Sequence, residues 1–273
     1  MIEKKNFKKD GYFTYSNFLS KKDKIEIEKQ FFAFTNLFRK KINVTDKKLI
    51  NKIKSNNDLS KFCVQLDKYN KDILFNFNGF IGFLPCFKKI SSNENLVDIA
   101  SRILDVKKEE LLVQEPTCLI NLPQNKRVLY NWHNAKNFYP KRNKYLNLWM
   151  PIIVDKKTNN GTMEVALGSH LKEYPFLEFK GYSKDGKNRL TQNFVPDYFH
   201  KNFKKKKMNL KFGDFLAMHP NLLHSSCYNS SKFCSYVIVW KVWHIGKDWT
   251  LSSNLSQKYF SNDTAALQDL KII

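Results

Sequence analysis

The feature that most constrains the fold is a change of hydrophobic period near Val106. Before this point apolar residues recur every three or four positions. After it, short apolar or alternating runs are separated by clusters of Pro, Gly, Asn and Lys. The first pattern is typical of amphipathic helices and the second of short strands. Several strands in succession without intervening helices favour a sandwich, barrel or jelly roll, so we expect a β core that carries N-terminal helices.

Capping residues place the helices of the first part. Ser20 can cap a helix over 21–39, in which Ile27, Phe31 and Phe38 share one face. Asp58 and Asn93 can cap a second and a third helix. We assign these apolar stripes to core packing.

The second part of the chain contains six strand-like runs. A polar stretch over 170–205 separates two of them and has the length of a functional lid or insertion. No linker divides the chain, so we expect a single domain over 1–273, with a mainly helical part over 1–108, a β core over 109–245 and a C-terminal tail over 246–273. The expected strands are 118–122, 128–134, 145–154, 162–167, 208–218 and 235–243.

The chain is strongly basic, yet its composition does not favour a nucleic-acid partner. Lys and Arg number 47 against 25 Asp and Glu, which gives a formal charge of +22. Only five of the 47 are Arg, the side chain that best reads bases and phosphates. We therefore expect a small-molecule substrate and no nucleic-acid partner; the sequence does not define the oligomeric state.

Five cysteines without a CxxC pair argue against a zinc site or a disulfide framework and favour a reducing compartment. The N-terminus has no apolar stretch typical of a signal peptide. The most apolar segment, 73–87, is interrupted by Asn, Gly and Pro and is too short to span a bilayer. These observations predict a cytoplasmic protein with no membrane partner.

Three histidines stand in distinctive surroundings. His133 lies in a WHNA run that is followed by Phe138-Tyr139-Pro140, and His170 closes a GSH run that follows Asn160-Gly161. His224 begins an HSS run, preceded by Gly213-Asp214-Phe215 and His219 and followed by Asn229-Ser230-Ser231.

In these blocks the chain resembles the phytanoyl-CoA dioxygenase family of the Fe(II)/2-oxoglutarate oxygenases. That family shows WHQD, then PGSH, then a GD block that leads to H-x-S-x-x-N-x-S and an arginine. The opening Asp10-Gly11-Tyr12 and Phe18-Leu19-Ser20 also resemble the family's N-terminal element. The blocks occur in order over roughly 10–243. The resemblance implies a double-stranded β-helix (jelly-roll) core with helices packed outside it, and Fe(II) and 2-oxoglutarate as cofactors.

The family holds iron with two His and one carboxylate. The resemblance assigns the two metal-binding histidines to His133 and His224, and the carboxylate position to Ala135. In an H-x-D motif both ligands share one strand face, so Asn134 points to the opposite face unless a bulge redirects it. Glu164 is a further candidate for a displaced carboxylate, although an ordinary strand residue is the simpler interpretation. The triad is therefore incomplete.

The family's 2-oxoglutarate arginine falls at Ser235, and no arginine follows Arg189. Loss of a bidentate partner for a buried dicarboxylate predicts weak 2-oxoglutarate binding or none. Lys232 or Lys241 can supply a positive charge, but Lys232 is expected in a turn and Lys241 far along the strand.

Three functions remain open, and the sequence assigns no catalytic residue. The first is an oxygenase-type oxidation, such as hydroxylation, of a small polar or sugar-linked metabolite at a modified metal site. The second is a halogenase-like variant, in which a halide takes the place of the carboxylate missing at Ala135. The third is a jelly-roll binding protein, or a repurposed enzyme, that has lost Fe(II) and 2-oxoglutarate chemistry.

Overall fold

The structure is a computed structural model that describes residues 2–42, 49, 52–126, 129–138, 144–153, 161–175, 177–182 and 189–245. Several expectations lie outside these residues. They concern the 246–273 tail and, within the strand and motif predictions, residues 128, 139, 140, 154 and 160.

Most helices of the structure belong to the N-terminal part. Ser20 begins α2 through a capping box, in which its Oγ accepts from the Asp23 amide and the Asp23 carboxylate accepts from the Ser20 amide. Asn93 caps α6 as expected. The helices of this part are α1 (Ile2–Asp10), α2 (Lys21–Lys41), α3 (Asn56–Tyr69), α4 (Lys71–Ile81), α5 (Pro85–Ser91) and α6 (Glu94–Leu104).

One helix expectation needs correction. The cap of α3 is Ser55 and not Asp58, because the Asp58 amide donates to the Ser55 Oγ and Asp58 itself lies in the first turn. The apolar segment 73–87 also forms parts of α4 and α5. Asn70 caps the first of these helices, and Pro85 takes the first position of the second, where a missing N–H costs nothing.

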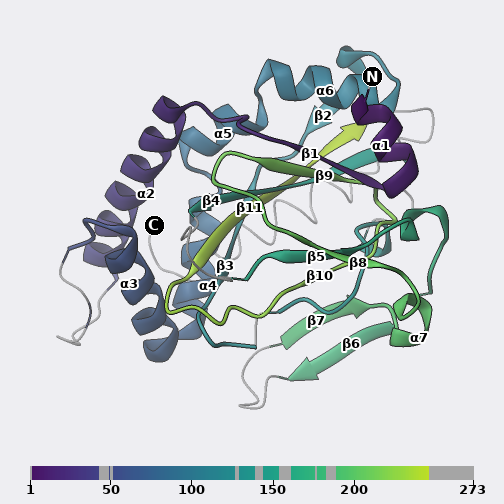
Figure 1. Cartoon of the computed structure of the whole chain (residues 1–273). Coiled ribbons are helices and arrows are strands. Elements are labelled where there is room, and N and C mark those ends of the chain that lie inside the picture. Colours follow the sequence, from purple (N-terminus) through teal and green to yellow (C-terminus); the bar gives the residue numbers. More distant parts are fainter. Residues whose placement is uncertain are drawn as a thin grey trace.

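Antiparallel strands form one large sheet, one small sheet and a hairpin (Figure 1). The large sheet has the order β1-β9-β4-β11-β2, and β3 pairs with β11 as well. The small sheet has the order β10-β5-β8, and β6 pairs with β7. Their bounds are β1 (Tyr12–Tyr15), β2 (Leu111–Val113), β3 (Thr117–Asn121), β4 (Tyr145–Ile153), β5 (Met163–Ala166), β6 (Leu177–Tyr182), β7 (Arg189–Phe194), β8 (Lys205–Met208), β9 (Phe215–Met218), β10 (His224–Ser226) and β11 (Ser235–His244).

The two larger sheets pack face to face. Trp149, Leu216 and Val237 of the large sheet share one apolar cluster with Val165 and Met208 of the small sheet. This packing closes the strands into a jelly roll, which confirms the predicted fold class.

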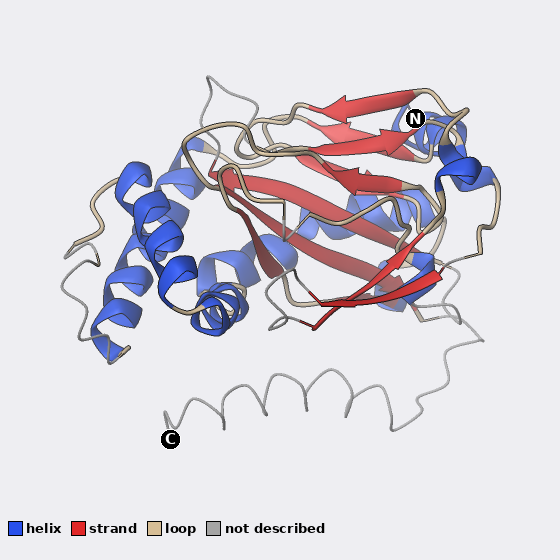
Figure 2. Ribbon diagram, turned by 90° about the horizontal axis from the view of Figure 1, so that it is seen from below, coloured by secondary structure: helices blue, strands red, loops and turns tan. Residues whose placement is uncertain are grey.

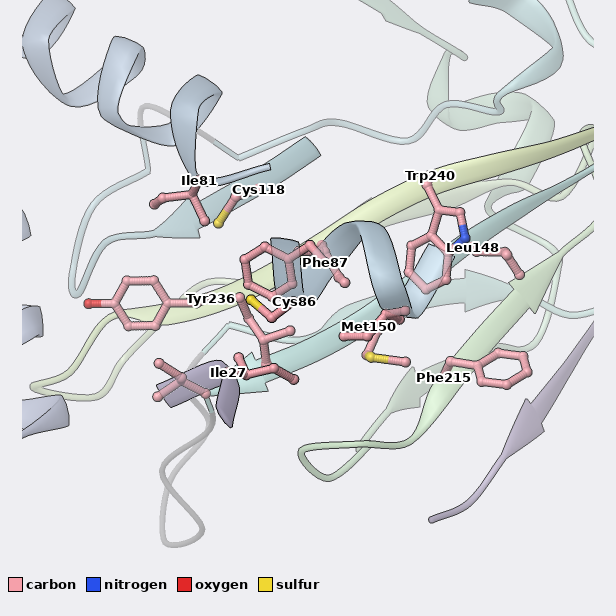
Figure 3. Close-up of a cluster of buried hydrophobic side chains, with 14 of the residues drawn as sticks. Ile27, Ile81, Cys86, Phe87, Cys118, Leu148, Met150, Phe215, Tyr236 and Trp240 are labelled. Carbon is pink, nitrogen blue, oxygen red and sulfur yellow. The ribbon is translucent and has the colours of Figure 1, made fainter. Parts of the chain in front are cut away.

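The other face of the large sheet is covered by helices. Along β11, Tyr236, Ile238 and Trp240 are fully buried in a cluster that includes Ile27 of α2 and Phe87 of α5. Figure 3 shows Ile27, Phe87, Tyr236 and Trp240 of this cluster. In Figure 2 the helices gather beside and behind the strands rather than between them. No helix within the described ranges is long and apolar enough to cross a membrane.

Three strand predictions differ from the structure. Residues 12–15 form β1, an edge strand paired with β9, inside a part that was expected to be helical. The run 208–218 is the end of β8 and the whole of β9, separated by a turn at Gly213 (φ 92°). Within 129–134 only His133 makes a β-bridge. The insertion 170–205 holds β6, β7 and α7 (Asp197–His200).

Candidate functional site

His133 and His224 are joined by their main chains. Each amide donates to the carbonyl of the other residue, at 3.0 Å and 2.9 Å, which makes an antiparallel bridge at the edge of the small sheet. Their ring centroids lie 4.3 Å apart. Two nitrogens that bind one divalent ion at about 2.1 Å each lie within about 4 Å of each other, and this arrangement permits that. The structure thus brings together the two histidines that the sequence singled out.

Backbone carbonyls orient both rings. His133 Nδ1 lies 2.6 Å from the Asn131 carbonyl oxygen, and His224 Nδ1 lies 2.9 Å from the Leu222 carbonyl oxygen. A carbonyl only accepts, so in the neutral rings the proton sits on Nδ1 and the lone pair on Nε2. This is the tautomer that a metal ion requires when it binds through Nε2.

Both imidazoles are neutral near pH 7. Burial lowers the pKa of His133 to about 4. Burial, followed by the neighbouring charges of His133 and Lys241, lowers the pKa of His224 to about 3. Neutral imidazole is the form that binds metals, so no proton has to be displaced from the site.

Ala135 leaves the carboxylate position apolar. Its side chain is buried in a small cluster with Tyr145 at the start of β4 and Trp243 near the end of β11. The two rings lie 4.4 Å apart between centroids. Asn134 does not replace the missing carboxylate, because its Oδ1 accepts a hydrogen bond from the Asn137 amide at 2.9 Å.

Lys241 lies on the inner face of β11. It alternates with Trp240 and Val242, which belong to the helix-covered cluster, and it pairs in register with the buried Asn147 of β4. Its Nζ lies 6.0 Å from the Trp243 ring centroid. Burial lowers the pKa of Lys241 to about 8, so the ammonium still predominates at neutral pH.

Ser235 occupies the expected arginine position at the opposite end of β11. It pairs in register with Asn121 of β3, and both residues lie on the inner face. The Ser235 Oγ and the Asn121 Oδ1 are buried, and neither has a hydrogen-bond partner among the residues that the structure describes. The Asn121 amide nitrogen donates to the carbonyls of Gly161 and Cys227, which fixes Oδ1 as the atom left over.

The remaining candidates lie away from the histidine pair. Lys232 is exposed in the turn before β11. Val165 is the register partner of His224, so the adjacent Glu164 points to the other face of β5 and cannot be a displaced ligand. His170 Nε2 lies 3.1 Å from the Lys8 carbonyl oxygen, and its ring packs on that of His219.

The site supplies some of the protein ligands that a metal ion of this family needs, but not all of them. Within the described ranges, no group of three His, Cys, Asp or Glu side chains could hold one. His133 and His224 supply two nitrogen donors with suitable tautomers, while the third protein donor of the facial triad is missing at Ala135. A 2-oxoglutarate anchor at Ser235 does not fit, because a hydroxyl and an acceptor oxygen replace the cation.

Sequence reasoning missed Tyr145, Asn147, Trp243 and Asn121 as parts of the inner wall. The signal was available in the strand runs, because residues two apart on a strand share a face. Lys241 and Trp243 therefore had to lie together, as did Tyr145 and Asn147. What the sequence could not supply was the register that sets Asn147 beside Lys241.

A family model described as "Phytanoyl-CoA dioxygenase (PhyH)" matches residues 7–234. No curated protein sequence matches the chain.

Several solved structures share the fold. The epimerase SnoN from nogalamycin biosynthesis, described as non-heme and alpha ketoglutarate dependent, is 14% identical with a TM-score of 0.52, covering 89% of this chain and 82% of its own. EctD from S. alaskensis is 13% identical with a TM-score of 0.55, covering 89% and 75%. The carbocyclase SnoK is 15% identical with a TM-score of 0.53, covering 94% and 89%.

Proposed function

Because the chain belongs to the phytanoyl-CoA dioxygenase (PhyH) family, we propose that it oxidises a small polar or sugar-linked metabolite at a modified non-haem iron site. The observation that carries the proposal is the pair of His133 and His224, held by two main-chain hydrogen bonds with each Nδ1 facing a backbone carbonyl. We expect this pair to hold one divalent ion, with ligands from solution in the position vacated at Ala135.

When bound, Fe(II) supplies the capacity to activate dioxygen for oxidation. The protein residues orient the components around it. The Asn131 and Leu222 carbonyls keep both imidazoles in the binding tautomer, while the rings of Tyr145 and Trp243 pack around Ala135.

The substrate class is supported by the structural neighbours. SnoN and SnoK come from nogalamycin biosynthesis, and EctD was solved with 2-oxoglutarate and 5-hydroxyectoine. A small polar ligand of this kind is compatible with an inner face that carries the rings of Tyr145 and Trp243 and the Asn147 amide. At 13–15% identity these neighbours share the fold alone, so the substrate class rests on proposal.

Metal binding tests the proposal directly. We would titrate the purified chain with Co(II) and with anaerobic Fe(II), using calorimetry and visible absorption. We expect one ion per chain, and a loss of affinity of about 100-fold or more in His133→Ala or His224→Ala. His244→Ala is the matched control, because His244 lies at the end of β11 near Glu110 and outside the pair. Equal affinity in the wild type and both site variants would exclude this site.

Oxygen consumption tests the reaction itself. Iron-dependent uptake of dioxygen that is stimulated by a small polar metabolite, and abolished in His224→Ala, is the expected result. The second candidate function is a binding protein without redox chemistry, which the apolar Ala135 and the neutral Ser235 favour. Ligand binding that persists unchanged in His224→Ala, without any metal bound to the wild type, would support that function instead.

A further inference from the structure

A cleft of about 540 Å³ lies beside β1, the edge strand of the large sheet (Figure 1). Every residue over 12–16 borders it, together with Asn6 and Asp10 of α1 and Lys206 of β8. Side chains alternate between the two faces of a strand. A cleft that touches five consecutive residues therefore follows the main chain of the strand rather than one of its faces.

The main chain of β1 directs hydrogen-bonding groups to this side. The His219 amide donates to the Gly11 carbonyl at 2.8 Å, which makes these two residues a hydrogen-bonded pair in the register of β1 and β9. In an antiparallel ladder such pairs alternate with pairs whose main-chain groups point away from each other. Tyr12 and Thr14 belong to the second kind, so their N–H and C=O groups point to the edge. In the part of the chain that the structure describes, β1 pairs with β9 alone, so these groups can receive an incoming strand.

The elements beside this edge are basic. The last turn of α1 carries two lysines and Asp10, and β8 carries three consecutive lysines at 205–207. The Lys206 Nζ donates to the Tyr12 Oη at 2.9 Å and lies 5.5 Å from the centroid of the same ring. An ammonium has three N–H donors, and this contact uses one of them. Five lysines against one aspartate favour an acidic partner over a neutral or basic one.

We propose that β1 is a docking edge for an extended acidic segment of a partner protein, which adds to the large sheet as an antiparallel strand beside residues 12–16. Five extended residues span about 17 Å, the length of this edge. A second copy of this chain does not fit, because its formal charge of +22 repels an equal charge and lysines beside an edge hinder pairing between copies. The inference concerns a surface outside the histidine pair and does not depend on the proposed function.

The two faces of β1 define the sequence of a suitable probe. Tyr12 belongs to the apolar cluster between the sheets and contacts Lys206, so acidic side chains of the segment belong on that face. Tyr15 lies on the opposite face, where it is 36% exposed and stacks on Phe215, so apolar side chains belong there. The probe is therefore a fluorescent hexapeptide of alternating glutamate and valine. Its control has lysine in place of glutamate.

Two measurements on the whole chain test the docking mode. Fluorescence polarisation should give a Kd below about 1 mM for the acidic peptide and an affinity at least about 10-fold weaker for the lysine peptide. Amide exchange followed by NMR should show new protection at Tyr12 and Thr14 when the acidic peptide binds. The amides of Phe13 and Tyr15 point to β9 and should change little.

Substitutions separate strand pairing from attraction to charge. Thr14→Pro removes an N–H at the edge and leaves the ladder with β9 intact, so it should weaken the acidic peptide by about fivefold or more. Thr14→Val keeps that N–H and is the matched control. Lys206→Glu should weaken the peptide by about 10-fold. Lys207→Glu changes the net charge equally, but Lys207 lies on the other face of β8 in register with Glu164, so the cost should stay below about threefold.

Three results would overturn the inference. The first is no binding of the acidic peptide at about 1 mM. The second is an equal loss in Lys206→Glu and Lys207→Glu with none in Thr14→Pro, which would indicate attraction to charge alone. The third is a dimer of the peptide-free chain that Thr14→Pro dissociates, which would assign the edge to a second copy. Thermal melts identify a variant that fails to fold, in which case amide protection in the wild type and the two lysine variants decide the question.

Discussion

The two faces of β11 have different roles: one packs against the helices and stabilises the fold, and the other carries residues of the candidate site. On the outer face Tyr236, Ile238, Trp240 and Val242 are fully buried against the helices. The inner face carries Ser235 at one end and Lys241 near the other. Because side chains alternate along a strand, substitutions on the inner face leave the helix-packed face intact. A member of this fold can therefore change its site residues and keep its architecture.

The largest effect should come from the outer face. Trp240→Ala should lower the free energy of unfolding by about 3–5 kcal/mol, because it removes a fully buried ring from the cluster under the helices. Urea denaturation followed by circular dichroism measures it. Trp240→Phe keeps an aromatic ring and removes an indole N–H that has no partner within the described part of the chain, so it should cost far less. Equal costs for the two variants would contradict the packing account.

The next effect tests whether the buried surroundings of Ala135 tolerate a carboxylate at that position. Ala135→Asp should destabilise the metal-free chain by about 1–3 kcal/mol, because it buries a carboxyl group against Tyr145 and Trp243. A divalent ion should recover this loss if the new carboxylate joins the two histidines. Thermal melts with and without Mn(II) measure both changes, and Ala135→Asn is the uncharged control.

The same reasoning extends to the double variant. Ala135→Asp with Ser235→Arg should bind metal and 2-oxoglutarate together and turn over 2-oxoglutarate, while each single change does less. Turnover by the unmodified chain would contradict the account of the broken site. A folded double variant that binds neither would favour the binding-protein function.

A third effect is a pH dependence of the free energy of unfolding, which we expect from the histidine pair and not from the helix-packed face of β11. The folded-state pKa of His133 is about 4 and that of His224 about 3, below the ordinary value of 6.5. As pH falls below about 6.5, both histidines bind protons in the unfolded chain but stay neutral in the folded chain. The free energy of unfolding therefore decreases. Between pH 6.5 and 5 the loss should be about 1–2 kcal/mol per histidine. Urea titrations at several pH values should show a shallower slope for His224→Leu than for the wild type, and an unchanged slope for Trp240→Phe.

The smallest effect concerns Ser235. Its Oγ is buried without a partner, so Ser235→Ala removes an unsatisfied hydroxyl and should stabilise the chain by less than about 1 kcal/mol. Denaturant midpoints measure the change. A clear loss of stability would show that the hydroxyl makes a hydrogen bond in solution, for instance to water shared with Asn121.

The fold was largely predictable because local signals agreed with the tertiary structure. Ser20 and Asn93 marked helix starts through side-chain capping, and the alternation in 145–154 and 235–243 marked the two central strands. β1 was missed, since four residues cannot display a period and the strand depends on pairing with β9. The helices α4 and α5 were not identified individually, because the Asn, Gly and Pro residues in and between them resembled breaks in one segment.

Only the part of the site that lies in sequence motifs was predictable. His133 and His224 were identified from their neighbours in sequence, and the structure places them together. The choice between Lys232 and Lys241 needed the register of β11, which puts one in an exposed turn and the other on the inner face. The burial of the Ser235 and Asn121 oxygens depends on three-dimensional packing, so it could not be predicted from the identity of either residue.

The reciprocal main-chain bonds between His133 and His224 also couple the movements of the two segments that carry these histidines. The segment that carries His133 cannot separate from β10 without breaking both bonds, so their amide hydrogens should exchange with solvent in one opening event. Because the bridge joins the two main chains, the same opening event would separate the two imidazoles and release an ion shared between them.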